Sequence, residues 1–203
     1  MAKGKGKWIR GNKAVCLSSL FLGMVLVMVW VIRPTLYDGW RHFYFLYPSL
    51  VILGILAMNR FRLLGIVVAI DMIFVVLFII TAHPLENVYF NPIISFQSSE
   101  WIRQNFELDY WGLSYRKGLE YIVGSDKSDH VPIVVANNPG NSNSMMLSHA
   151  DRVRIEYLPV EEINRAKYFV TNYRWHPSEY SLGTEAYRVE VAGVKVLSVY
   201  KLD

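Results

Sequence analysis

The chain has 203 residues, of which 53% are hydrophobic, and carries 21 Lys and Arg against 17 Asp and Glu. The charge is divided unevenly, because residues 1–82 hold nine Lys and Arg against Asp38 and Asp71, while residues 83–203 hold twelve against fifteen Asp and Glu. The basic excess lies beside long apolar runs, and the polar half has no basic stripe of the kind that nucleic acid requires, so nucleic-acid binding is excluded. The single cysteine, Cys16, excludes an intramolecular disulfide.

Three long apolar runs predict a membrane protein with three transmembrane helices that contact the lipid bilayer. They cover residues 14–32, 43–58 and 63–82, and a span of about 20 residues crosses a bilayer core of roughly 30 Å. The second run is somewhat short to cross the bilayer by itself. It is long enough if the aromatic residues before it lie at one membrane interface and Arg60 after it lies at the other. The one charge inside the runs is Asp71, which we expect to make a packing contact or to meet a partner in the membrane.

The positions of the basic residues predict the orientation of the spans. Residues 1–13 form a basic tail, and Arg60 and Arg62 form a basic turn, so that seven Lys and Arg lie on one side against Arg33 and Arg41 on the other. Because the basic side stays cytoplasmic, we expect a multi-pass protein of the inner (cytoplasmic) membrane with a cytoplasmic N-terminus. Three crossings then make the C-terminal half periplasmic or extracellular. No small-residue cleavage site follows the first run, which predicts a retained anchor.

Residues 83–203 have the composition of a soluble α/β domain. Residues 85–106, rich in aromatic residues and turn formers, are expected to cover the membrane-proximal surface. The patterns then predict an amphipathic helix at 113–123, strands at 132–136, 153–158 and 167–173, short helices at 142–150 and 160–166, and a closing hairpin of 187–191 and 194–201. Because strands alternate with helices, we expect a small, mostly parallel sheet with helices on its faces.

The common signatures of catalytic chemistry are missing from the sequence. The five histidines have no metal-ligand spacing, no serine or cysteine lies in a nucleophile motif, and there is no glycine-rich phosphate loop. The segment Asn137-Asn138-Pro139-Gly140-Asn141 follows a predicted strand, and is either a ligand turn at the strand's carboxyl end or a plain turn. No catalytic residue, metal ligand or cofactor site is therefore assigned.

Three polar and aromatic stretches remain, all on the expected outer side. They are YDGWRHF at residues 37–43, His83-Pro84 followed by Tyr89-Phe90-Asn91, and ELDYWGLSYR at residues 107–116. In this order and placement they resemble the C-terminal part of bacterial membrane glycosyltransferases related to the dolichyl-phosphate-mannose protein mannosyltransferases, a family with the GT-C fold. The resemblance covers residues 34–116 and, more loosely, residues 167–173 and the final hairpin through Lys201. It departs from the family at Pro92-Ile93-Ile94, where relatives often continue from the asparagine with glycines.

The resemblance implies transfer of a sugar from a polyprenyl-phosphate carrier to an acceptor on the outer face of the membrane. Family members are longer, carry their catalytic acidic residues in the first external loop, and can use a divalent metal. Asp38 matches a late motif of the family and is not assigned the catalytic role. We therefore expect this module to need a multi-span membrane subunit that carries the acidic loop, or to be a truncated and inactive relative.

The motif near the membrane supplies three candidate substrate-binding residues, Asp38, Arg41 and His42. Arg41 and His42 are suited to contact the phosphate of the lipid-linked sugar, with Asp38 orienting Arg41. The alternative is an Asp–Arg pair that only holds the loop in place.

The external motif supplies three more candidates, Asp109, Tyr110 and Trp111. An aromatic face beside a carboxylate suits a sugar platform, and the alternative is an anchor that packs the external domain on the membrane half. A function from another class also stays open, namely a non-enzymatic membrane-anchored scaffold that binds a glycan or another envelope protein.

Overall fold

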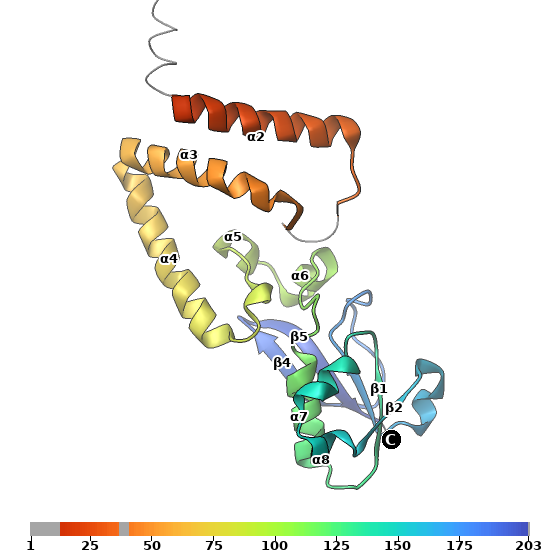
Figure 1. Ribbon diagram of the computed structural model, residues 1–203. Coiled ribbons are helices and arrows are strands. Elements are labelled where there is room, and N and C mark those ends of the chain that lie inside the picture. Colours follow the sequence, from red (N-terminus) through yellow and green to blue (C-terminus); the bar gives the residue numbers. More distant parts are fainter. Residues whose placement is uncertain (1–12, 37–40, 203) are drawn as a thin grey trace, which may run out of the picture. The chain divides into compact units, whose positions relative to one another are not determined.

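The computed structural model describes residues 13–36 and 41–202 (Figure 1). The chain divides into two compact units, Met1–Val75 and Val76–Asp203, and each is described by itself. Most of the predicted basic tail, residues 1–12, and the candidate residue Asp38 lie outside the described residues.

The first unit consists of long apolar helices. They are α2 (Lys13–Ile32), the 3-10 helix η1 (Arg41–Leu46) continuing into α3 (Tyr47–Arg60), and α4 (Arg62–Ala82), whose last two turns belong to the second unit. Within the described residues, three helical stretches are long and apolar enough to cross a membrane: Lys13–Ile32, Arg41–Arg60 and Arg62–Ala82. They coincide with the three runs that the sequence marks as spans.

The apolar side chains of these helices point outward as well as inward. The rings of Phe21 in α2 and Phe45 in η1 meet edge to face, with centroids 6.1 Å apart. In contrast, Leu63 on α4 is 73% exposed and Trp30 on α2 is 75% exposed. A helix that is apolar on all sides offers no polar face to water.

The second unit contains a five-stranded sheet in the order β2-β1-β3-β5-β4. Its strands are β1 (Val131–Val135), β2 (Ile155–Leu158), β3 (Tyr168–Thr171), β4 (Thr184–Val191) and β5 (Val194–Lys201). Strand β1 runs parallel to β2 and β3, whereas β5 runs antiparallel to both β3 and β4. The prediction of a mostly parallel sheet is wrong, because the closing hairpin joins this sheet with β5 antiparallel to β3. The tight turn at Ala192 and Gly193 makes β4 antiparallel to β5 as well, since a two-residue connection permits only antiparallel neighbours.

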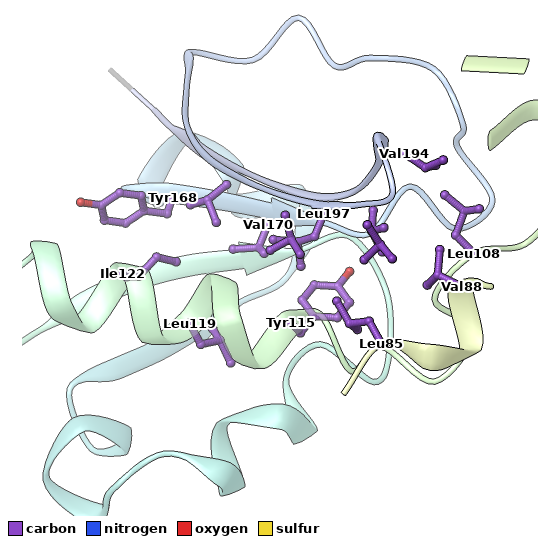
Figure 2. Packing of buried hydrophobic residues seen from close by; sticks show 14 of the residues in the cluster. Leu85, Val88, Leu108, Tyr115, Leu119, Ile122, Tyr168, Val170, Val194 and Leu197 are labelled. Carbon is purple, nitrogen blue, oxygen red and sulfur yellow. The ribbon is translucent and has the colours of Figure 1, made fainter. Parts of the chain in front are cut away.

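Helix α7 (Tyr115–Ser125) covers one face of the sheet. Its side chains Tyr115, Leu119 and Ile122 recur every three or four residues and are fully buried, the spacing that places them on one side of a helix. Figure 2 shows Tyr115 and Ile122 between the helix and the strand residues Val170 and Leu197. Gly118 allows the close approach, since a Cβ there would lie 3.0 Å from Leu197 Cδ2.

Short helices complete the second unit. They are η2 (Glu86–Val88), α5 (Pro92–Ser95), α6 (Ser99–Asn105), η3 (Ser142–Met146), α8 (His149–Arg152) and η4 (Val160–Arg165). The stretch 85–106 thus has defined turns, and Leu85 and Val88 join the core beneath the sheet. The opposite face of the sheet buries Phe169 and Tyr200 against Ile163 of η4 and Tyr180 of the β3–β4 connection.

Candidate functional site

The carboxyl ends of β1 and β3 lie side by side, because the two strands are parallel neighbours. Strand β1 leads into the Asn137–Asn141 turn, and β3 leads into the segment Asn172–His176. The carboxyl edge of parallel strands is where α/β domains commonly place ligands. The two connecting segments therefore define the first place to look for a site.

Asn172 joins three parts of this edge through one buried side chain. Its amide oxygen accepts hydrogen bonds from Asn137 Nδ2 at 3.0 Å and from the backbone N–H of Arg174 at 3.3 Å. Its Nδ2 donates to the carbonyl oxygen of Asp109 at 2.9 Å, and the Tyr115 hydroxyl donates to its oxygen at 3.5 Å. Asn172 therefore couples the two strand ends to the turn that precedes α7.

Asp109 builds that preceding turn. Its carboxylate is buried and accepts hydrogen bonds from the backbone N–H of Leu113 at 2.9 Å, from that of Ser114 at 2.7 Å, and from the Ser114 hydroxyl. Gly112, with φ at +67°, supplies the left-handed residue that the turn requires. Both Asp109 oxygens are thus occupied within the fold, which gives the residue a positioning role beside the candidate surface.

Four planar side chains form a continuous row on this edge, which we call the aromatic–arginine row: Trp111, Tyr110, Arg174 and Trp175. The rings of Trp111 and Tyr110 meet edge to face at 5.1 Å. The Arg174 guanidinium carbon lies 4.0 Å from the Tyr110 ring centroid and 4.5 Å from that of Trp175. A guanidinium between two aromatic faces gains a cation–π attraction on each side. The row is therefore held by its own members.

The two ends of the row are open, and its centre is enclosed. Trp111 is 61% exposed and Trp175 is 73% exposed, whereas most of the Arg174 side chain is buried. The guanidinium donates to the Tyr110 carbonyl oxygen at 3.4 Å and lies 3.7 Å from the Glu107 carboxylate. Among the residues that the structure describes, Arg174 Nε and Asn137 Oδ1 are buried without a hydrogen bond. The row thus presents two exposed indoles around a largely buried guanidinium.

The backbone that carries Arg174 adopts an unfavourable conformation. Tyr173 has φ at +62° and Trp175 has φ at +65°, a left-handed region in which bulky residues are rare outliers. Such outliers persist only where the surroundings enforce them, and they cluster at functional sites. One such residue stands on each side of Arg174, so the surrounding structure imposes the shape of this segment.

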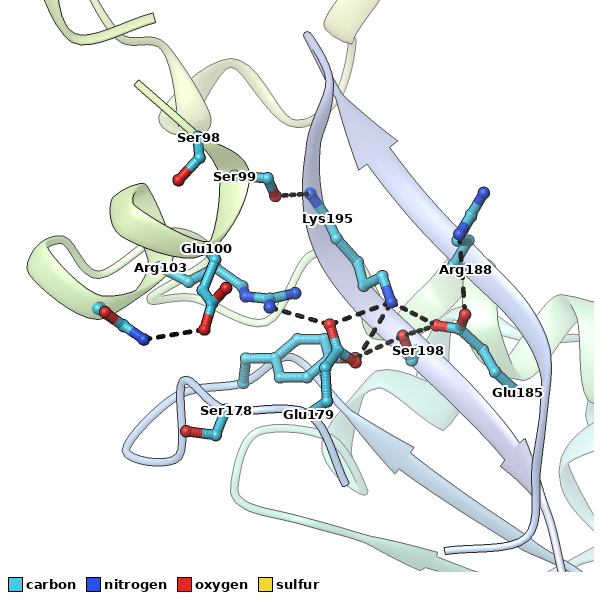
Figure 3. Close-up of polar contacts among 12 residues, drawn as sticks. Ser98, Ser99, Glu100, Arg103, Ser178, Glu179, Glu185, Arg188, Lys195 and Ser198 are labelled. Atoms are coloured by element: carbon cyan, nitrogen blue, oxygen red, sulfur yellow. Dashed lines mark hydrogen bonds and ion pairs between the residues drawn. The ribbon is translucent and has the colours of Figure 1, made fainter. Parts of the chain in front are cut away.

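A polar cluster enforces this conformation from the other side of the segment (Figure 3). The Tyr173 hydroxyl donates to Glu179 at 2.9 Å and lies 2.8 Å from the Ser198 hydroxyl. Glu179 also pairs with the buried Arg103 at 2.9 Å and with Lys195 at 3.2 Å. The cluster ties the β3–β4 connection to α6 and to β5, and so fixes the segment that carries Arg174 and Trp175.

The charges of the cluster are set by these contacts. Partial burial acts to raise the pKa of the Glu179 carboxyl, but hydrogen bonds from Tyr173, Lys195 and Arg103 outweigh it and hold this pKa at about 2. Burial raises the pKa of the Tyr173 hydroxyl well above its usual range. At neutral pH the cluster therefore holds an ionised Glu179 and a neutral Tyr173.

The candidates near the membrane lie in a different part of the chain. Arg41 and His42 begin η1 in the first unit and are exposed, while Asp109, Tyr110 and Trp111 lie in the second unit. The structure brings Tyr110 and Trp111 together with residues that the sequence reasoning did not single out, namely Asn172, Arg174 and Trp175. The signal available for these was the polar and aromatic run TNYRWH directly after a predicted strand.

Across residues 13–36 and 41–202, no three His, Cys, Asp or Glu side chains come close enough to hold a metal ion.

Comparisons of the chain with protein-family models, curated proteins and solved structures find no match.

Proposed function

We propose that this protein is a membrane-anchored module whose external domain binds a carbohydrate on the aromatic–arginine row. We propose further that it serves a glycosyltransferase system that uses a polyprenyl-phosphate-linked sugar, the chemistry implied by the family that its three motifs resemble. The observation that carries the proposal is the pair of exposed tryptophans, Trp111 and Trp175, held on either side of a stacked tyrosine and arginine.

The membrane part of the proposal rests on the apolar surface of the first unit. A soluble protein rarely exposes a contiguous apolar patch larger than a few hundred Å², whereas α2, α3 and α4 expose apolar side chains along their whole length. Lipid is the solvent that such a surface matches. The positions of the basic residues beside the spans support the further proposal of a cytoplasmic N-terminus and a second unit outside the cytoplasmic membrane.

The carbohydrate part rests on the chemistry of the row. Exposed aromatic faces offer flat apolar surface to the C–H face of a sugar ring, and small-molecule sites pair such surface with a few fixed polar groups. Here Arg174 supplies N–H donors for hydroxyl or acidic oxygens of a glycan, and its guanidinium is already oriented by Tyr110 and Glu107. Little side-chain entropy is lost on binding, because the fold has already fixed these groups.

In this account the transfer chemistry is shared with another subunit. Arg41 and His42, at the start of η1, contact the phosphate of the lipid-linked sugar. The row binds the acceptor or the transferred sugar. Asp109 acts through the turn that it builds and does not itself touch the sugar. The acid or base that activates the acceptor is supplied by a multi-span membrane partner.

The experiment is a binding measurement on the full chain in lipid nanodiscs. Soluble oligosaccharides from bacterial envelopes are titrated while the tryptophan fluorescence is followed, and the affinity is compared for the wild type, Trp111→Ala and Trp175→Ala. Trp30→Ala is the matched control, because Trp30 is similarly exposed but lies on α2. We expect at least tenfold weaker binding for the two row variants and no change for the control. Equal affinities in all four proteins contradict the proposal.

A second candidate function is a non-enzymatic scaffold that binds a glycan without taking part in transfer. It is favoured by the hydrogen bonds that occupy both oxygens of Asp109 and by the pairing of the Glu107 carboxylate with Arg174, since both carboxylates beside the row are already engaged within the fold. The two functions are separated by transfer of radiolabelled sugar from a polyprenyl-phosphate donor in membranes with and without the protein. Transfer that falls with Trp175→Ala at normal protein abundance supports the transferase role, and unchanged transfer supports the scaffold.

A further inference from the structure

We infer that the short helix α5 inserts into the membrane leaflet at which α4 ends, with Ile93 and Phe96 immersed among the lipids. This inference rests on the membrane anchoring proposed above, and adds a second lipid contact made by the external domain itself. The partner is a phospholipid bilayer surface.

The first observation is that α5 presents apolar side chains outward in a fixed geometry. Phe96 is 88% exposed and Ile93 is 76% exposed, whereas Phe90 and Ile94 pack against the core of the domain. The turn is held by the Asn91 side chain, whose oxygen accepts the backbone N–H of Ile94 at 3.2 Å. Ile93 and Phe96 are therefore part of an ordered turn whose other apolar side chains already pack against the core.

The second observation is that the segment leading into this turn packs beside the last turns of α4. The ring of Tyr89 meets the ring of Phe78 on α4 edge to face, with centroids 5.1 Å apart. Phe78 lies one turn before Ala82, the final residue of α4, which is about 6 Å back along the helix axis. The chain thus returns alongside α4 after leaving it, and α5 begins three residues beyond Tyr89.

The third observation is the absence of charge. No Asp, Glu, Lys or Arg occurs from Asn87 to Ser99, and the first charged residue after this stretch is Glu100. Aromatic residues are enriched at the membrane interface, and large apolar side chains such as those of Ile93 and Phe96 lie at the boundary with the acyl chains in segments that rest on a bilayer. The exposure of Ile93 and Phe96, the contact of Tyr89 with α4 and the absence of charge all support lipid as the surrounding of these two side chains.

The test places a spin label at single cysteines in the full chain, in a Cys16→Ser background, reconstituted into vesicles of phosphatidylethanolamine and phosphatidylglycerol. The test position is Phe96→Cys. The lipid reference is Ile73→Cys on α4 and the aqueous reference is Val153→Cys beside α8, both exposed in the structure. Collision of each label with oxygen, which concentrates in lipid, is compared with collision with a water-soluble nickel chelate.

We expect the label at position 96 to match the α4 reference, with oxygen collisions exceeding chelate collisions severalfold and the reverse at position 153. A label at position 96 that behaves like position 153 overturns the inference. If position 73 is also reached mainly by the chelate, the membrane anchoring fails together with it, so the two failures are distinguishable. Ile93→Cys is the second test position if Phe96→Cys does not fold.

Discussion

The apolar residues of α4 and those of α7 have opposite relations to their surroundings. Leu77 on α4 is exposed, and so are most of its neighbours, whereas Leu119 on α7 is fully buried under the sheet. The two helices have similar hydrophobic side chains, but only α7 alternates them with polar ones at helical spacing. Hydrophobic content alone therefore does not define a core. The pattern decides whether a helix folds against protein or, as we propose for α4, against lipid.

The largest expected difference between the two helices comes from making the same substitution, leucine to alanine, in each of them. Leu119→Ala removes buried side-chain atoms and leaves a cavity, so we expect a loss of about 2–5 kcal/mol in the unfolding free energy of the domain. Leu77→Ala removes atoms that face outward, and we expect a change below about 1 kcal/mol. Both are measured by denaturant unfolding of the full chain in nanodiscs. Equal losses would show that α4 packs against protein along this face.

The next largest change in the unfolding free energy is expected from the buried residue Asn172. Asn172→Ala leaves Asn137 Nδ2 and the Arg174 backbone N–H without their shared acceptor, and an unmet buried donor costs about 1–3 kcal/mol. Asn164→Ala on the exposed side of η4 is the control, with an expected change within about 0.5 kcal/mol. The same unfolding assay measures both, and an unchanged midpoint for Asn172→Ala would refute its role as the connector of the three segments.

The Glu179 cluster predicts a dependence of stability on pH. Because the pKa of Glu179 in the folded protein is lowered from 4.5 to about 2, its contribution is fully present above pH 4.5 and is lost as the pH falls from there through 2. Glu179→Gln removes this ionisation, so its stability should fall less steeply in that window. Glu161→Gln, at an exposed position of η4, should keep the wild-type slope. Thermal melts across this pH range make the comparison.

The smallest expected effect concerns the strained backbone at Trp175. Glycine adopts a φ of +65° without steric cost, whereas alanine pays roughly 1 kcal/mol for it. Trp175→Gly should therefore be more stable than Trp175→Ala by about that amount, while both lose carbohydrate binding. A Trp175→Gly protein less stable than Trp175→Ala would mean that the left-handed conformation is not the source of strain at this position.

Much of the architecture follows from the sequence because its local signals are strong. The long apolar runs define α2, α3 and α4, and the β-branched segments around Ile133 and Val170 define two buried strands. The closing hairpin was predictable, but its place in the sheet was not, because alternation of strands and helices does not reveal that β5 pairs antiparallel with β3. Local pattern thus determines elements, while strand order depends on how they pack.

The candidate surface was only half predictable for the same reason. Tyr110 and Trp111 stand out as an aromatic pair in a recognisable motif, but Arg174 and Trp175 lie about 64 residues further along the chain. They reach Tyr110 only because β1 and β3 are neighbours and because Asn172 links their ends to the turn of Asp109. No local pattern encodes a left-handed Tyr173 or Trp175.

The central claim is that the chain crosses the membrane three times and exposes its sheet domain on the far side. Alkaline phosphatase, active only outside the cytoplasm, and green fluorescent protein, fluorescent only inside it, are each fused after Arg62 and at the carboxyl terminus. We predict fluorescence without phosphatase activity after Arg62, and phosphatase activity without fluorescence at the carboxyl terminus. The same reporter signal at both positions would contradict the topology and, with it, the proposed external carbohydrate site.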